Sequence, residues 1–393
     1  MKKWACCILV LLLVLGCMPG CSDSPQVIDT GETGHQVTIN SCGETSGYQM
    51  AETANGYYLN LNRTLYYADK TDLSTWVPVC NEPDCSHNRP SCSAKMVCDE
   101  FYLQDGRIYT IKHKCDVVPL SVDNSYVLVS FAPDGTDLTV EFEIVESNIT
   151  SGWMDAVLTP DGVYGQCFNL LNDGTYKALV VHADQQGTDV IYEGQTSVDF
   201  AVDAQYFWTT REWDGMYGDL AFASSALAAN EKESFEGLYR IADGSYEPIS
   251  HLDECNAWGA LLTGNHLYHY EQNDGFYLTD LETGASKKQM PTQLSDGEAY
   301  HLQSDYIIET NIYYGSNTNR PKLLLFENGQ WNTVKLPADA KELSNGSFIP
   351  LAVSTEGLFI LAWQDNVYSL YQVRKTEKAY ELTLCRQFGL YES

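Results

Sequence analysis

Two short patterns recur along this chain about every 50 residues, and that spacing restricts the fold more than any other feature of the sequence. The first pattern is a turn pair such as Asn-Gly or Asp-Gly, followed by an apolar strand that carries an aromatic residue. It is centred on Tyr58, Tyr109, Tyr164, Phe207, Tyr268, Ile307 and Phe359. The second pattern is an apolar strand that runs into an acidic or polar turn. It covers residues 66–72, 131–136, 181–187, 239–244, 277–284, 325–329 and 371–376.

Both patterns predict β-hairpins, because Asp-Gly and Asn-Gly supply positive φ angles while aromatic and β-branched residues favour strands. Repeats of about 40–50 residues built from hairpins are typical of β-propeller blades. The sequence therefore predicts an all-β fold, a β-propeller of about seven blades over residues 47–393. Six blades, eight blades, or a pair of β-sandwiches are the alternatives. Residues 219–234 predict a short helical insertion in the fourth unit.

The N-terminus has the order of a secretory signal, with two lysines, an uncharged stretch over residues 4–15, and then small residues. This stretch is shorter than the about 20 apolar residues that a membrane-spanning helix needs. Residues 14–17 read Val-Leu-Gly-Cys and resemble a bacterial lipobox, in which the cysteine is lipidated and becomes the mature N-terminus. That resemblance implies lipidation of Cys17. Cys21 is the alternative lipidation site, and an ordinary cleaved signal is the alternative to both.

These features divide the chain into a lipoprotein signal peptide (1–16), a polar tether (17–46) and the β-propeller domain (47–393). We therefore expect an extracytoplasmic protein held at the cell membrane by its N-terminal lipid. The chain has 53 acidic and 23 basic residues, a formal net charge of −30. Such a charge repels phosphate backbones, so nucleic acid is excluded as a partner.

Four candidate metal ligands stand between the first and second units, namely Cys80, Cys85, His87 and Cys92. Three thiolates and one imidazole suit a tetrahedral Zn²⁺ site, although the spacing matches none of the standard structural zinc patterns. The alternative is a loop closed by disulfides, with His87 as an ordinary polar residue, which suits an exported protein. Both interpretations give the cluster a structural role.

This stretch, with Ala94 two residues beyond Cys92, resembles a group of propeller-like lipoproteins from Gram-positive anaerobes. They carry Cys-x4-Cys-x-His-x4-Cys-x-Ala after the first blade and begin with an N-terminal lipid signal. The resemblance implies a propeller on a lipid anchor. It implies no activity, because these relatives are largely of unassigned function.

A second cysteine pair is expected in the hairpin over residues 98–115. Its turn at Asp105 and Gly106 places Cys98 and Cys115 opposite each other. Opposed residues have Cα atoms about 4.5–5.5 Å apart, which a disulfide tolerates. The three cysteines of the cluster cannot then all pair among themselves. Either one of them reaches a distant cysteine such as Cys42, or all three bind metal with His87.

Residues 206–218 are the most site-like stretch, with aromatic and charged side chains on a predicted loop. The candidate residues for stacking on and hydrogen bonding to a sugar are Arg211, Glu212, Trp213, Asp214 and Tyr217. We favour the alternative, in which the aromatic residues of this stretch fill the blade core and its charges are solvated.

The sequence contains no Gly-x-Ser-x-Gly, no His-Glu-x-x-His, no phosphate-binding glycine loop and no calcium loop. This favours a surface-anchored binding lipoprotein over an enzyme, with a glycan or an envelope protein as its ligand. The alternative is a carbohydrate-active enzyme, a glycosidase or lyase that uses carboxylates in the pore. A propeller that senses or stabilises an envelope partner is a third hypothesis. No catalytic residue can be named, and the only cofactor indicated is structural zinc.

We expect the mature protein to begin at Cys17 with a diacylglyceryl group on its sulfur, because a short apolar run and Gly16 precede it. Mass spectrometry of the N-terminal peptide checks this. The same group on Cys21 would select the alternative cysteine, and an unmodified N-terminus further along the chain would contradict lipidation.

Overall fold

The computed structural model covers the chain and describes most of its strands. The backbone is described for residues 36–37, 48–97, 101–119, 121, 125–144, 151–159, 162–170, 176–194, 196–200, 206–212, 237–242, 245–248, 258–263, 266–271, 275–290, 299–303, 306–310, 321–327, 330–345, 347–352, 358–377 and 379–389. Between residues 151 and 310, side chains are described only for 158–159, 162–165, 179–193 and 277–288.

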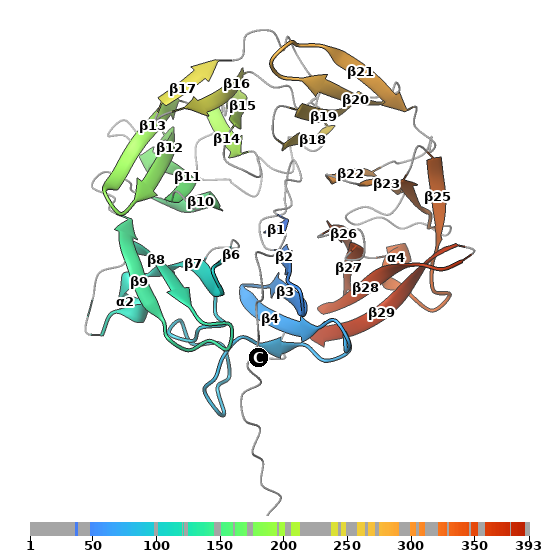
Figure 1. Cartoon of the computed structure of the whole chain (residues 1–393), viewed down its shortest axis with the longest axis horizontal. Coiled ribbons are helices and arrows are strands. Elements are labelled where there is room, and N and C mark those ends of the chain that lie inside the picture. The colour runs from blue at the N-terminus through green and yellow to red at the C-terminus, as the bar shows by residue number, and fades with distance from the viewer. Residues whose placement is uncertain are drawn as a thin grey trace, which may run out of the picture.

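The strands of the described residues form seven four-stranded antiparallel units, which stand around a ring (Figure 1). Each unit consists of four consecutive strands, and we call these units blades 1 to 7 in chain order. The all-β class and the β-propeller are therefore confirmed. Blades 6 and 7 form one larger sheet, because their outermost strands also pair in parallel through Val334 with Tyr380 and Lys335 with Glu381.

Within each blade the strands follow one another from the inner to the outer side of the ring (Figure 1). Blade 1 comprises β2 (Tyr48–Glu52), β3 (Gly56–Leu61), β4 (Thr64–Asp69) and β5 (Val77–Pro78). Blade 2 comprises β6 (Phe101–Gln104), β7 (Arg107–His113), β8 (Tyr126–Phe131) and β9 (Thr139–Ile144). Blade 3 comprises β10 (Ser151–Thr159), β11 (Gly162–Leu170), β12 (Tyr176–Asp184) and β13 (Gly187–Gly194).

The remaining blades follow the same order. Blade 4 comprises β14 (Thr196–Phe200), β15 (Tyr206–Glu212), β16 (Gly237–Ala242) and β17 (Ser245–Pro248). Blade 5 comprises β18 (Trp258–Thr263), β19 (His266–Glu271), β20 (Gly275–Asp280) and β21 (Ser286–Met290). Blade 6 comprises β22 (Ala299–Gln303), β23 (Tyr306–Thr310), β24 (Leu323–Glu327) and β25 (Gln330–Lys335). Blade 7 comprises β26 (Ser347–Ala352), β27 (Leu358–Gln364), β28 (Val367–Lys375) and β29 (Tyr380–Gly389).

In the part of the chain that the structure describes, three short elements lie outside the blades. Strand β1 (Gln36–Val37) pairs with β2, beside Ala51 and Met50. The helices α2 (Lys114–Val117) and α4 (Glu342–Asn345) are single turns. No helix of the described residues is both long and apolar enough to cross a membrane.

The two repeated sequence patterns correspond to fixed strands of each blade. Every centre of the first pattern, from Tyr58 to Phe359, lies in the second strand of its blade. Every instance of the second pattern begins in the third strand of its blade. The described part of the tether is the two-residue strand β1. The helical insertion over 219–234, both candidate lipidation sites and most of the tether lie outside the described residues, so these remain predictions.

The glycine of the first pattern is required by a close backbone approach. A Cβ atom on Gly56 would lie 2.4 Å from the carbonyl oxygen of Ala68, on the third strand of blade 1. A Cβ atom on Gly162 would lie at the same distance from the carbonyl oxygen of Ala183, on the third strand of blade 3. The same contact in two blades explains why the turn pair ends in glycine.

The acidic residue of the second pattern caps the hairpin between the third and fourth strands. Asp184 accepts backbone N–H groups from Gln186 at 2.6 Å and Gly187 at 3.1 Å. Asp280 accepts the N–H of Glu282 at 3.1 Å in the equivalent turn of blade 5. Such side chains mimic a backbone turn, which explains the repeated aspartate.

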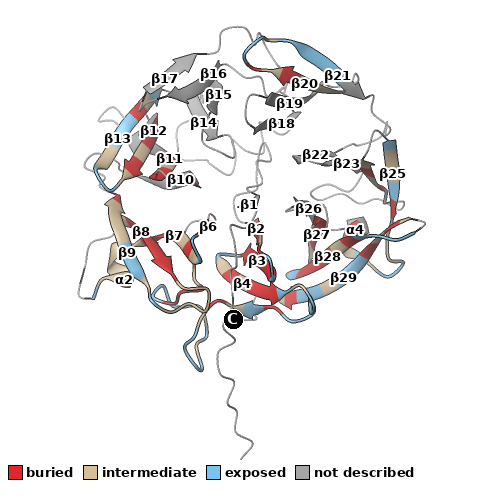
Figure 2. Ribbon diagram, viewed as in Figure 1, coloured by how far each residue is buried: buried red, intermediate tan, exposed pale blue. Residues whose placement is uncertain are grey.

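The core of the described residues lies between blades, because middle strands such as β3 and β27 are buried on both faces. In β3, Tyr57 and Leu59 pack against blade 7, while Tyr58 packs against blade 2. In β27, Phe359 packs against blade 1 while Ile360 faces blade 6. Figure 2 shows this distribution, with buried residues on the middle strands and exposed residues on outer strands such as β13 and β29.

The ring closes between blades 1 and 7 by packing, since each of these blades is built from one continuous stretch of chain. The rings of Tyr57 and Phe359 meet edge to face with centroids 5.0 Å apart. Phe388 lies 5.2 Å from Tyr66, and the Tyr368 hydroxyl donates to Asn62 Oδ1 at 3.0 Å. Packing between blades 1 and 7 therefore closes the ring, without a sheet that the two ends of the chain share.

Truncation of a side chain in this interface should loosen the ring. Leu361, with 0% exposure, packs against blade 1, whereas Leu384 in the same blade is 46% exposed. We expect Leu361→Ala to lower the free energy of unfolding by about 2–5 kcal/mol, because it removes buried methyl groups and leaves a cavity. Leu384→Ala is the matched control and should cost much less. Chemical denaturation measures both, and equal effects would contradict the packing.

Candidate metal centre

The Cys/His loop, residues 79–97, connects blade 1 to blade 2. Both of its ends are bonded to one residue of β4. The Val79 N–H donates to the Leu65 carbonyl at 2.9 Å, and the Leu65 N–H donates to the Ala94 carbonyl at 2.8 Å. Leu65, Val79 and Ala94 are fully buried. The loop therefore leaves the edge of β4 and returns to it, and Ala94 marks the point of return.

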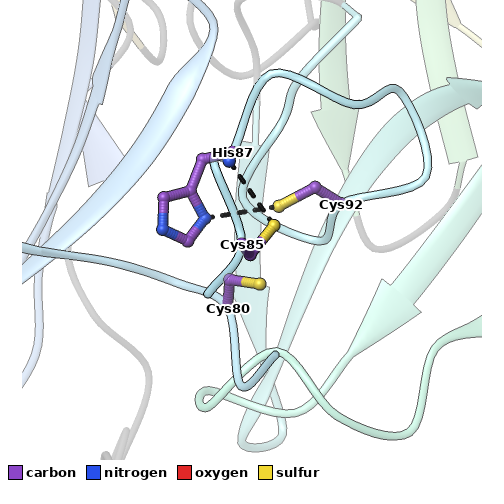
Figure 3. Close-up of side chains that lie close together, drawn as sticks. All are labelled: Cys80, Cys85, His87 and Cys92. Atoms are coloured by element: carbon purple, nitrogen blue, oxygen red, sulfur yellow. Dashed lines mark hydrogen bonds between the residues drawn. The ribbon is translucent and has the colours of Figure 1, made fainter. Parts of the chain in front are cut away.

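The loop brings the four predicted ligands together. The sulfur atoms of Cys80, Cys85 and Cys92 and a ring nitrogen of His87 all lie within 4.8 Å of one another (Figure 3). Cys92 Sγ lies 3.6 Å from His87 Nδ1. A zinc ion with bonds of about 2.3 Å to sulfur and about 2.0–2.1 Å to nitrogen places tetrahedral ligands about 3.6 Å apart. The cluster therefore has the donor set and the separations that a metal ion requires.

Two tight turns fold the loop around this point. The Cys85 N–H donates to the Glu82 carbonyl at 3.3 Å, and the Cys92 N–H donates to the Arg89 carbonyl at 3.0 Å. Asp84 and His87 have φ angles of 61° and 53°, in the left-handed region that aspartate and histidine enter more readily than most residues. The His87 N–H also points to Cys85 Sγ at 3.4 Å, so the backbone itself supports one thiolate.

Charges around the cluster differ between its two sides. Arg89 donates to Cys85 Sγ at 3.5 Å and forms an ion pair with Glu82. This hydrogen bond lowers the pKa of the Cys85 thiol. Cys92 lies on the buried side, and burial, together with the neighbouring Cys80, raises its pKa to about 12. A metal ion must therefore displace a proton from Cys92 at neutral pH.

The imidazole of His87 is in the state that a metal needs. Burial lowers the pKa of His87, with Glu82 acting in the opposite direction. The ring is therefore neutral at pH 7, and a neutral imidazole is the form that binds metal ions.

The disulfide alternative is not what the structure contains. Cys80, Cys85 and Cys92 are all free thiols, and the described residues hold no bridge among them. Sulfur–sulfur bonds are about 2.05 Å long, far shorter than the separations of a metal shell. Of the two interpretations of the sequence, the arrangement of these side chains fits the metal centre.

Blade 2 contributes a close contact that the sequence did not single out. Gly135, in the turn between β8 and β9, has a φ angle of +83°. A Cβ atom at this position would lie 2.5 Å from Ser93 Oγ and 3.0 Å from Cys80 Cα. The loop thus rests on the backbone of blade 2 next to its first ligand. The pair Asp134-Gly135 indicates a turn in the sequence, but nothing in the sequence indicates this contact.

The hairpin expected over residues 98–115 is present as strands β6 and β7, which cover residues 101–113 and do not include Cys115. Phe101 faces Thr110 and Gln104 faces Arg107, with the turn at Asp105 and Gly106. Cys115 lies in α2, directly after β7. Cys98 falls outside the described residues, so its pairing with Cys115 stays a prediction.

The proposed sugar-binding stretch is described only in part. The backbone of Arg211 and Glu212 belongs to the end of strand β15, not to a loop as the sequence suggested, and Glu212 faces Thr196 of β14. The stretch continues as strand because β15 pairs on both sides, with β14 and β16. Trp213, Asp214 and Tyr217 lie outside the described residues, so a ligand site there remains a prediction.

No known family model matches this chain, and no curated protein matches it either. Solved structures are similar at low identity. YCF48 bound to D1 peptide matches with a TM-score of 0.47 and 11% identity, over 90% of this chain and 100% of that one. The β-propeller domain of the Trilobed protease from Pyrococcus furiosus matches with a TM-score of 0.42 and 10% identity, over 89% of this chain and 98% of that one.

An acylaminoacyl peptidase in complex with Z-Gly-Gly-Phe-chloromethyl ketone also matches, with a TM-score of 0.46 and 12% identity over 90% of this chain. The match covers 52% of that chain, so this protein spans about half the length of the peptidase. At such identities the similarity concerns the propeller fold and says nothing of a ligand or a reaction.

Proposed function

We propose that this protein is a membrane-anchored, extracytoplasmic binding protein, a β-propeller whose Cys/His loop is held by a structural zinc ion. The zinc assignment rests on the convergence of three sulfur atoms and one imidazole nitrogen within 4.8 Å. Zn²⁺ binds this donor set in tetrahedral sites. The anchor at Cys17 and the signal before it rest on the sequence alone.

The centre is structural because its four protein ligands complete a tetrahedral shell. Catalytic zinc sites keep one position open for water or substrate, and they use three protein ligands. Cys80, Cys85, His87 and Cys92 leave no such position. The ion therefore joins the two turns of the loop rather than activating a molecule.

The same ion accounts for free thiols in an exported protein. Outside the cytoplasm, cysteines within reach of one another are oxidised to disulfides. A thiolate bound to zinc is held in place by the metal, and its sulfur is engaged in a metal bond rather than in a disulfide. The three reduced cysteines of the loop are therefore consistent with export when metal is bound.

The zinc assignment predicts about one ion per chain after anaerobic purification, measured by elemental analysis, since the four ligands form one shell. Cys92→Ser should remove most of it, because this ligand comes from the buried side of the cluster. Cys385→Ser is the matched control, since Cys385 lies in β29 of blade 7, and it should leave the zinc content unchanged. A metal-free protein with a bridge between two of the cluster cysteines would contradict the assignment.

The ligand class is a glycan or an envelope protein, as the sequence analysis suggested. A glycan array with the mature body, without its lipid or a tag, separates binding from catalysis. We expect retention of a glycan without release of product, because neither the sequence motifs nor the four-ligand centre supplies catalytic machinery. Released oligosaccharide would contradict the binding role and support the glycosidase alternative. Protein pull-down from an envelope fraction is the corresponding measurement if no glycan is retained.

A further inference from the structure

A charged side chain from blade 2 lies fully buried against the Cys/His loop. Lys112, in β7, has 0% exposure. Its Nζ atom donates to the carbonyl oxygens of Cys92 at 2.7 Å, Lys95 at 2.5 Å and Pro90 at 3.4 Å. All three acceptors belong to the segment that carries the most buried ligand of the metal centre.

These contacts match the chemistry of the group. A lysine ammonium has three N–H donors and no acceptor, so three carbonyl oxygens satisfy it. Burial of such a charge is costly unless it is hydrogen-bonded and balanced by opposite charge. The carbonyls of the loop supply three such hydrogen bonds.

An occupied zinc centre carries charge of the opposite sign. Three thiolates and one neutral imidazole around Zn²⁺ carry one net negative charge. The ammonium of Lys112 bonds to the backbone of the ligand Cys92 itself, so the two opposite charges lie next to each other. Arg89 provides a second cation at Cys85, on the exposed side of the loop.

We propose that Lys112 is a positioning residue of the metal centre, which fixes the Cys92 segment for zinc through these three hydrogen bonds. This inference rests on the proposed zinc site. Lys112 belongs to blade 2, whereas the two ends of the loop are bonded to Leu65 in blade 1. Zinc binding and the junction between the two blades are therefore coupled through one side chain.

The test is Lys112→Met, which keeps the length of the side chain and removes its donors and its charge. Residues that orient metal ligands without binding the metal themselves change metal affinity by about 10–100-fold when they are replaced. We expect a loss of zinc affinity in that range, measured by competition with a chromophoric chelator on the folded protein. The spectrum of the Co²⁺-substituted protein should also change, because the geometry at Cys92 is altered. A purely structural loss would leave that spectrum as it is.

Lys335→Met is the matched control. Lys335, in β25 of blade 6, forms an exposed ion pair with Glu381, in β29 of blade 7. The zinc affinity and the Co²⁺ spectrum of the Lys335→Met variant should equal those of the wild type. If Lys112→Met also keeps wild-type affinity and spectrum, the inference is overturned while the zinc site stands. A wild-type protein that binds no zinc would instead overturn the proposed function.

A second measurement on the wild-type protein applies even if Lys112→Met fails to fold. Coupling is reciprocal, so zinc must stabilise the Lys112 contacts by as much as Lys112 favours zinc. Removal of zinc by a chelator should therefore raise the rate at which an amine-reactive reagent labels Lys112, by about 10-fold or more. Labelling of the exposed Lys335 should not change. Equal labelling of Lys112 with and without zinc would overturn the inference.

Discussion

Among the described residues, middle strands such as β3 and β27 are buried on both faces, and a sheet of this kind can bury both faces only between two others. In β3, successive side chains point to opposite sides, so Tyr57 reaches blade 7 and Tyr58 reaches blade 2. The arrangement of the chain follows from this constraint. Because every blade needs a neighbour on each side, the row of blades must close, and here it closes through Tyr57 and Phe359 without a shared strand.

The Cys/His loop stands at one of these junctions. Val79 and Met96, near its two ends, belong to the apolar cluster that joins blade 1 to blade 2. Leu65 bonds the ends together, and Lys112 and Gly135 bring blade 2 against the middle of the loop. A metal ion in the loop therefore acts on a blade junction and not on a pendant segment. This placement explains how a loop with many polar residues keeps a fixed shape beside a hydrophobic core.

Much of this architecture could be predicted from the sequence, because it depends on local chemistry. The turn pairs mark the second strands, since Gly56 and Gly162 must admit the carbonyl of a neighbouring strand. The aspartates mark the turns after the third strands, since Asp184 and Asp280 bond the backbone of their own hairpins. The sequence predicts a loop at Arg211 and Glu212, whereas strand β15 extends through both, with Glu212 paired to Thr196 of β14.

The sequence by itself determined the all-β class, the repeat, and the identity of the four residues that could hold a metal ion, since all lie within hairpins or within one short loop. It left metal and disulfides as alternatives, because spacing alone does not say how far apart the sulfur atoms lie. Only the tertiary structure decided that they converge with His87 within 4.8 Å. It alone brought Lys112 to the carbonyl of Cys92, since the two residues belong to different elements and meet only when blade 2 packs on blade 1.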